Sequence, residues 1–157
     1  MGLTEKVHRN ADLSAHPGEI PVNYLYTMGL AGEGFFRALK DRGRLTAAAC
    51  PACGTVYLPP RIFCERCFER TGKPFAVAST GTVHTFTVCH EEVDGSPKGK
   101  PEIVAAVRID GTDGTLVHRL DGVAPGDVYI GMRVKMVLKP AKKREGNILD
   151  IMHFKPV

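Results

Sequence analysis

Two pairs of cysteines have the residue type and spacing that bind a metal ion in this sequence of 157 residues. Cys50 and Cys53 form one C-x2-C pair, and Cys64 and Cys67 form a second one. Each pair can form a tight turn that directs two thiolates to one point, and four thiolates are a ligand set that zinc prefers. A closed shell of four protein ligands leaves no position for a reactive water. These four cysteines therefore predict a structural, noncatalytic Zn2+ site.

Iron, disulfide bonds and a redox C-x-x-C are the alternatives to zinc. A fifth cysteine, Cys89, leaves an odd number for pairing, and we expect no secretory leader from the polar residues at the start of the sequence. A redox motif would need only one of the two pairs. Iron accepts the same ligands, but zinc is the commoner ion in such sites. We favour zinc for these reasons.

No other motif in the sequence predicts an independent active site. The sequence contains no Gly-rich phosphate loop, nucleophile elbow or His-Glu metal helix. Cys89 and His90 are neighbours in a β-rich segment, where successive side chains point to opposite faces, so they form no direct dyad. We read His84, His90 and Cys89 as ordinary residues. We therefore expect no catalytic residues, although the chain can still be a subunit of an enzyme.

The composition is that of a globular protein, with 43% hydrophobic and 24% charged residues. Its short apolar stretches predict no transmembrane segment, and we expect a cytoplasmic protein. The net charge is +4, and much of the excess lies between Arg133 and Arg144. This basic cluster is either a solvated loop or a site for an anionic ligand.

The first 44 residues are predicted to form an extended arm and a short helix. Residues 1–28 show no helical or strand period, and their apolar end predicts packing against the protein's body or a partner. Residues 32–42 match a helix, in which Phe35, Phe36 and Leu39 have the i, i+3, i+4 spacing of one face. This face either packs on the protein's own core or docks a partner. Because so short a helix has little domain of its own to cover, we assign these three residues as candidate partner-docking residues.

The rest of the chain is predicted to be mainly β. A zinc ribbon occupies residues 45–78, with a strand over 55–58. Residues 79–157 contain short β-rich segments and turn signals but no helical crossover, which favours a closed five-stranded OB-type barrel over an open sandwich. The expected strands are 81–90, 102–110, 115–120, 132–139 and 147–154, with a polar loop over 94–101.

The order of these parts resembles a known family. After the helix, Tyr57-Leu58-Pro59-Pro60-Arg61 lies between the cysteine pairs, Gly81-Thr82-Val83 opens the barrel, and Ile130-Gly131-Met132-Arg133-Val134 precedes its fourth strand. Over residues 30–157 this pattern is similar to the family that joins a rubredoxin-like zinc ribbon to an OB-fold, known as domain of unknown function thirty-five. The resemblance implies a structural zinc ion and an accessory subunit of thiolase-fold enzymes that act on acyl-CoA.

The partner that this resemblance implies is a catalytic subunit such as a thiolase, a hydroxymethylglutaryl-CoA synthase or a retro-aldolase, held in a hetero-oligomer. Coenzyme A has phosphates, so basic side chains are candidates for contacting its nucleotide end. We assign Arg61, Arg133 and Lys135 as candidate CoA-contacting residues, with the cluster over 142–144 as a further possibility.

Binding of single-stranded nucleic acid is the alternative function, because zinc ribbons and OB barrels both serve it. Such binding needs stacking aromatic residues and a basic groove. The barrel segment offers only Phe86, Tyr129 and Phe154, the sequence has no tryptophan, and acidic residues are spread along the barrel. We therefore expect an enzyme partner rather than nucleic acid.

Overall fold

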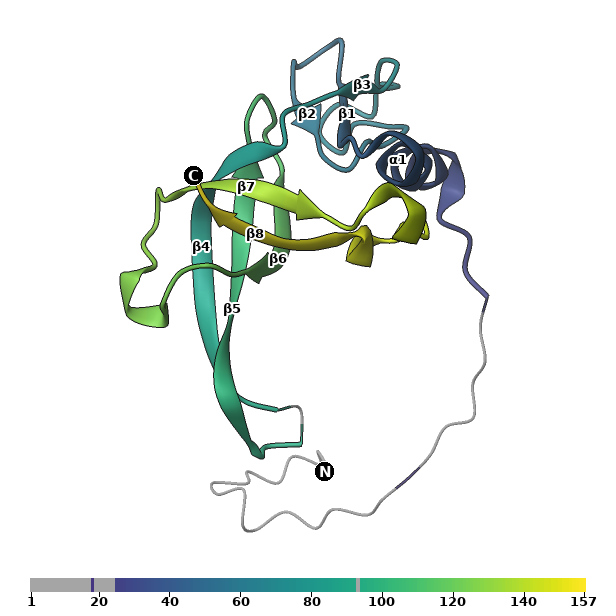
Figure 1. The fold of residues 1–157 in the computed structure, drawn as a ribbon. Helices are drawn as coiled ribbons and strands as arrows, with labels where there is room; N and C mark the ends of the chain where they lie inside the picture. The colour runs from purple at the N-terminus through teal and green to yellow at the C-terminus, as the bar shows by residue number, and fades with distance from the viewer. Residues whose placement is uncertain (1–17, 19–24, 93) are drawn as a thin grey trace, which may run out of the picture.

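The structure, a computed structural model, describes residue 18, residues 25–92 and residues 94–157. Figure 1 shows one helix, a small three-stranded sheet and a larger barrel in chain order. Most of the arm predicted over residues 1–28 lies outside the described residues. Among the helices that are described, none has the length and apolar character needed to cross a membrane. The fold is mainly β, as predicted.

Helix α1 (Gly29–Arg42) begins earlier than the predicted Gly32 and ends where predicted. Gly43 follows it in the left-handed conformation, at φ 62°, and its backbone N–H donates to the carbonyl of Leu39 over 3.0 Å. A residue with a Cβ is disfavoured in this conformation, so glycine ends the helix here.

The apolar face of α1 packs on the protein's own core. Phe35 and Leu39 are 1% and 0% exposed, and Phe36 is half-buried against the same core. The partner-docking role predicted for Phe35 and Leu39 is therefore wrong, and Phe36 offers only part of its ring to a partner. The reason is that the barrel core extends through Leu45 and Leu58 of the ribbon to the helix, so the short helix does have a domain to cover.

The ribbon contains a three-stranded antiparallel sheet in the order β2-β1-β3. The strand predicted over 55–58 is present as the shorter β2. The strands are β1 (Thr46–Ala49), β2 (Val56–Tyr57) and β3 (Phe75–Ala76).

Five strands close the barrel in the order β4-β5-β6-β8-β7, the Greek-key order of an OB-fold. All pairs are antiparallel except β6 with β8. The predicted five-stranded OB-type barrel is confirmed. The strands are β4 (Thr80–Glu91), β5 (Pro97–Ile109), β6 (Thr115–Leu120), β7 (Arg133–Leu138) and β8 (Ile151–Pro156).

Two predicted boundaries in the barrel differ from the structure by four residues or more. The polar loop expected over 94–101 is shorter, because β5 begins at Pro97 and extends a hairpin with β4 beyond the barrel (Figure 1). The last strand begins at Ile151 instead of residue 147. The preceding residues form a 3-10 turn, because the buried Asp150 carboxylate accepts the backbone N–H groups of Glu145 and Gly146 over 2.8 and 2.7 Å.

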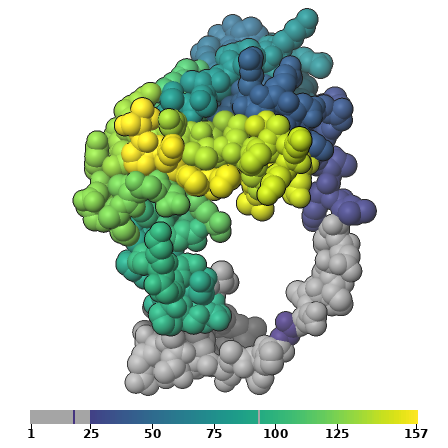
Figure 2. Space-filling model, viewed as in Figure 1, coloured from purple at the N-terminus to yellow at the C-terminus, as the bar shows by residue number. Residues whose placement is uncertain are grey.

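The ribbon and the barrel meet at the turn between β5 and β6. The backbone N–H of Val56 donates to the Asp113 carboxylate over 2.8 Å, and the N–H of Asp113 donates to the carbonyl of Val56 over 3.0 Å. In the space-filling view, helix and ribbon in blue lie directly against the yellow-green strands of the barrel (Figure 2). The predicted division into residues 1–44, 45–78 and 79–157 stays a prediction.

Candidate metal centre

Each cysteine pair lies in a turn of the same form. The N–H of Gly54 donates to the carbonyl of Cys50 over 2.9 Å, and the N–H of Phe68 donates to the carbonyl of Cys64 over 3.0 Å. The residue after each pair is in the left-handed region, with φ 75° at Gly54 and φ 58° at Phe68. These tight turns aim two sulfur atoms of each pair toward the other pair.

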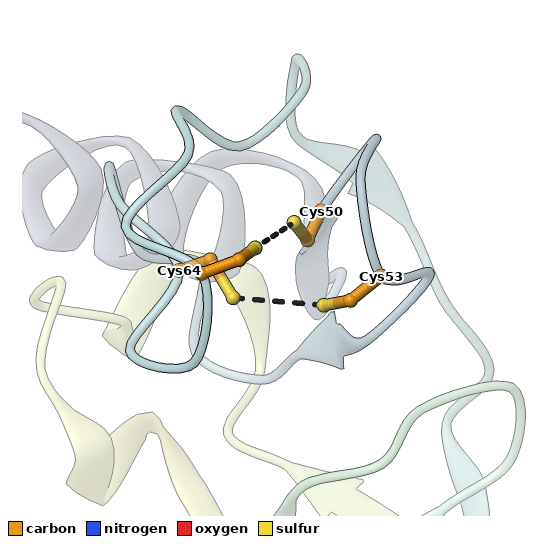
Figure 3. Close-up of side chains that lie close together, drawn as sticks. Cys50, Cys53 and Cys64 are labelled. Carbon is orange, nitrogen blue, oxygen red and sulfur yellow. Dashed lines mark hydrogen bonds between the residues drawn. The ribbon is translucent and has the colours of Figure 1, made fainter.

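The four sulfur atoms converge on one point. Cys50 Sγ lies 3.4 Å from Cys67 Sγ, and Cys53 Sγ lies 3.6 Å from Cys64 Sγ, a convergence that Figure 3 shows for three of the residues. All four sulfurs lie within 4.8 Å of one another. Four thiolates around zinc, each at ~2.3 Å, would lie about 3.8 Å apart, so the cluster fits the ion. The sulfur separations are too long for disulfide bonds, which need about 2.05 Å.

Hydrogen bonds lower the pKa of two of the four thiols, those of Cys64 and Cys53. The Tyr57 hydroxyl lies 3.1 Å from Cys64 Sγ and lowers the pKa of Cys64 to about 6, while this contact raises the pKa of Tyr57 to about 12. Hydrogen bonds with Thr55 likewise lower the pKa of Cys53. Both shifts favour the thiolate form that a metal needs.

The thiol of Cys67 resists ionisation while no cation lies among the four sulfurs. The backbone N–H of Glu69 lowers its pKa, but hydrogen bonds with Cys50 and Cys64 raise it, and the pKa of Cys67 lies at about 12. Several thiolates at this spacing repel one another unless a cation lies between them. The cluster therefore has the chemistry of a metal site. Because all four ligands come from the protein, it has the closed shell of a structural zinc site.

The candidate CoA-contacting residues lie in two parts of the fold. The guanidinium of Arg61, in the ribbon, lies 5.1 Å from the centre of the Tyr57 ring and pairs with Glu65. Arg133 and Lys135 are exposed residues two positions apart on β7 of the barrel. Arg133 is held by both carboxylate oxygens of Asp110, each at 2.7 Å.

The basic cluster over 142–144 is partly structural. The Arg144 guanidinium donates to the carbonyl of Lys139 over 2.9 Å and to the carbonyl of Lys40 in α1 over 3.4 Å. Lys142 and Lys143 are exposed. These two lysines are therefore the exposed members of the cluster, whereas Arg144 is half-buried. Cys89 lies on β4, outside the metal cluster.

Two features of this region were missed in the sequence. Phe68 directly follows the second cysteine pair and is 82% exposed. The sequence could have revealed it as unusual, because Gly54 occupies the matching position after the first pair. A cavity of about 290 Å³ lies between the start of α1 and the ribbon, and Arg61, Arg70 and Lys73 line it. No motif marks this cavity, because its residues come together only in the fold.

The fold and the cysteine cluster define the protein as a rubredoxin-like zinc ribbon joined to an OB-fold barrel. Residues 37–71 match the family described as "ChsH2, rubredoxin-like zinc ribbon domain". Residues 75–139 match the family described as "ChsH2, C-terminal OB-fold domain".

Two archaeal proteins named "DUF35 domain-containing scaffold protein" are similar over 125 residues. The one from Methanocaldococcus jannaschii is 30% identical, over 78% of this chain and 88% of that protein. The one from Methanothermobacter thermautotrophicus is 28% identical, over 77% and 92%. The chain belongs to the DUF35 family, the family of domain of unknown function thirty-five, as the sequence pattern predicted.

Two solved structures share the fold. A DUF35 protein of unknown function from Sulfolobus solfataricus aligns with a TM-score of 0.64 at 23% identity, over 82% of this chain and 87% of that chain. A structure described as "Ltp2-ChsH2(DUF35) aldolase" aligns with a TM-score of 0.59 at 27% identity, over 88% and 98%. The second structure is that of an aldolase with a DUF35 component.

Proposed function

We propose that this chain is a noncatalytic, zinc-binding accessory subunit of a thiolase-type enzyme complex that acts on acyl-CoA. The catalytic partner in this proposal is a thiolase, a hydroxymethylglutaryl-CoA synthase or a retro-aldolase, and the two chains form a hetero-oligomer. The relatives named as scaffold proteins and the aldolase structure with a DUF35 component support this reading. A closed metal shell also supports it, because such a site braces a fold and performs no reaction.

We place the partner at exposed apolar side chains of α1 and the ribbon. Leu30 is 82% exposed at the start of α1, and Phe63 and Phe68 are 58% and 82% exposed in the second half of the ribbon. Exposed aromatic residues of this size typically mark protein interfaces. We therefore propose Leu30, Phe63 and Phe68 as docking residues in place of Phe35 and Leu39.

The backbone of Phe68 is the main support for its proposed docking role. A non-glycine residue at φ 58° is strained by ~1 kcal/mol or more, and glycine at the matching position 54 avoids this cost. The Phe68 ring is 82% exposed, so packing within the chain does not offset the strain. A large exposed ring in a strained turn points to a partner that uses it.

We also propose that basic side chains of this chain contact CoA in the complex. Arg61 lines the 290 Å³ cavity together with Arg70 and Lys73. Glu65 pairs with Arg61 but does not line the cavity, so the basic lining suits a phosphate group of the nucleotide end. Arg133 is less available because Asp110 already holds its guanidinium. Lys135, exposed on the same strand, stays a candidate.

The substitution Phe68→Gly tests the proposal, with a full-length tagged chain purified from its native cells. We expect wild type to co-purify with a thiolase-fold enzyme in near-stoichiometric amount, identified by mass spectrometry. The variant should bind that enzyme at least about tenfold more weakly, as for a lost aromatic anchor. Its own stability should stay equal or rise by up to about 1 kcal/mol, because the strain at residue 68 is removed.

Ile130→Gly is the matched control, because Ile130 is 67% exposed on the barrel and its backbone is not left-handed. This variant should keep the partner. The proposal is wrong if the wild-type chain co-purifies with nucleic acid instead, or with no thiolase-fold enzyme. A Phe68→Gly chain that binds the enzyme as tightly as wild type would remove Phe68 from the interface.

Nucleic-acid binding gains no support from the barrel. Of the three aromatic residues that the sequence offered for stacking, Phe154 is buried and Phe86 is half-buried. Tyr129 is 60% exposed. A single exposed ring does not make a stacking platform for successive bases.

A further inference from the structure

The barrel wall opens between β6 and β8. These strands pair at only one position, Leu120 with Phe154, whereas β7 and β8 pair from Val134 to Leu138. Because β6 and β8 are parallel, Val117 and His118 would lie opposite the start of β8, but no ladder pairing joins them there. The strands separate at this end, and the residues around the gap surround a hollow.

The hollow has a volume of about 620 Å³, within the range of small-molecule sites. Val117, Leu149 and Met152 are among its lining residues and are 63%, 60% and 46% exposed. Apolar side chains from β5, β6, the 3-10 turn η4 (Ile148–Asp150) and β8 therefore face one space. This lining suits an alkyl chain.

All ionisable side chains that line the hollow are basic. They are His118, Arg119, Lys139 and His153, and no carboxylate lines it. Arg119 pairs with Glu102, which lines a neighbouring cavity instead, so part of its charge is compensated. Lys139 is half-buried at the end of β7. Lys139 forms no ion pair with the described residues, although its charge acts on the nearby buried Asp150 carboxylate, so it supplies the positive charge that is complementary to an anion.

His118, one of the lining residues, has an unsatisfied ring nitrogen. The ring is 9% exposed, and its Nε2 lies 3.4 Å from the carbonyl of Ile148. Its Nδ1 is buried and has no hydrogen-bond partner in the part of the chain that the structure describes. Native proteins seldom leave a buried polar atom without a partner.

We propose that this hollow binds an apolar carboxylate, with its alkyl chain against Val117, Leu149 and Met152 and its carboxylate beside Lys139. None of the proposed docking residues Leu30, Phe63 and Phe68 lines this site. It also requires no catalytic partner, so its test and the test of the proposed function fail independently.

Titration of the isotope-labelled full-length, zinc-loaded chain with decanoate, followed by amide NMR, tests this site. We expect saturable shifts at the residues of the hollow, among them Val117 to Arg119 and Ile148 to His153. Decanol has the same chain without the charge and should bind at least about fivefold more weakly. Lys139→Met should lower decanoate affinity by a similar factor, because it removes the cation nearest the proposed carboxylate position.

Lys155→Met is the matched control, because it makes the same change at an exposed residue of β8 that does not line the hollow. Its decanoate affinity should equal that of wild type. The site is excluded if shifts are scattered over the surface without saturation. Equal weakening by Lys139→Met and Lys155→Met, or equal affinity for decanol, would overturn the assignment of an anionic ligand.

Discussion

At the scale of single residues, the sulfur of Cys64 depends on a side chain outside the ligand set. Tyr57 is 7% exposed, and its hydroxyl lies 3.1 Å from Cys64 Sγ. A hydrogen bond from this hydroxyl stabilises the thiolate, and such outer contacts commonly change metal affinity by 10- to 100-fold. Tyr57 therefore belongs to the metal centre, although it binds no metal itself.

We predict that Tyr57→Phe weakens zinc binding about tenfold at neutral pH, because the pKa of Cys64 then rises and less thiolate is present. Competition with a chromophoric chelator measures the affinity. Tyr129→Phe, which removes a hydroxyl from a ring that is 60% exposed on the barrel, should leave the affinity unchanged. Equal affinities for wild type and Tyr57→Phe would show that the hydroxyl does not support the site.

The Asp110 carboxylate predicts a pH dependence of stability. Hydrogen bonds from Arg133 and then Thr80 lower the pKa of Asp110 to about 2, against an ordinary value of about 3.9. A lowered folded-state pKa stabilises the fold above the unfolded value, and this stabilisation is lost as pH falls from about 4 through 2. Since Asp110 and Arg133 are 35% and 52% exposed, solvent screening limits it to roughly 1 kcal/mol.

Asp110→Asn should therefore be less stable than wild type at pH 6 by roughly 1 kcal/mol, and this difference should shrink below pH 4. Urea unfolding of both proteins at each pH measures the difference between their free energies of unfolding. Acid also releases zinc, but it does so from both proteins, so this effect cancels in the difference. If the difference in unfolding free energy stays constant from pH 6 to pH 2, the charge of Asp110 is not its cause.

At the scale of elements, α1 packs on the core through its buried face, so we expect that shortening a side chain of this face destabilises the protein. Leu39 is 0% exposed in the shared core, so Leu39→Ala should destabilise the protein by about 2–5 kcal/mol. Leu30→Ala in the same helix should cost less than about 1 kcal/mol, because Leu30 is 82% exposed. Thermal unfolding of the zinc-loaded proteins compares them. Similar small losses for both would mean that α1 is not part of the core.

The contact between ribbon and barrel depends on a glycine. A Cβ at Gly114 would lie 2.7 Å from the backbone carbonyl oxygen of Leu58, closer than real contacts. Gly114→Ala must therefore move the ribbon away from the β5–β6 turn. We expect a cost of about 1–3 kcal/mol, as for other overpacked sites.

Gly99→Ala is the control for this substitution, because a Cβ at Gly99 would meet nothing within 4 Å. Urea unfolding should show a clear loss for Gly114→Ala and little change for Gly99→Ala. Amide shifts at Val56 and Asp113 should report the disturbed contact. Unchanged stability and shifts in Gly114→Ala would mean that the two parts do not meet as the structure has them.

At the scale of the whole molecule, metal removal should affect the two parts unequally. The ribbon has few buried residues of its own, so zinc is expected to supply on the order of 10 kcal/mol of its folding free energy. The barrel is closed by five paired strands and has its own buried side chains, such as Val107, Val134 and Phe154. We predict that a strong chelator unfolds residues 46–76 while the barrel strands remain.

Hydrogen exchange before and after chelation measures this difference by residue. Amides of β1 and β2 should lose protection, and amides of β4, β5 and β6 should keep most of it. Refilling with Zn2+ should restore the ribbon amides. Loss of protection in both parts together would show that the shared core couples them into one unit.

Local spacing determined much of what the sequence revealed about this protein. Two C-x2-C pairs predict a metal cluster because each turn is formed by neighbouring residues, and the four cysteines do converge. Gly43 ends α1 because a left-handed residue is a local requirement. The strand over 115–120 was placed correctly because alternation and flanking turns act over a few residues.

Only the tertiary structure decided which apolar residues are covered. Phe35 and Leu39 form a stripe that fits either a core or a partner, and packing against a barrel formed later in the chain buries them. Phe68 stays exposed for the same kind of reason, since burial depends on segments distant in the sequence. The opening between β6 and β8, with Lys139 at its edge, likewise arises from strand pairing across the barrel. Such contacts follow from chain topology, which no local pattern specifies.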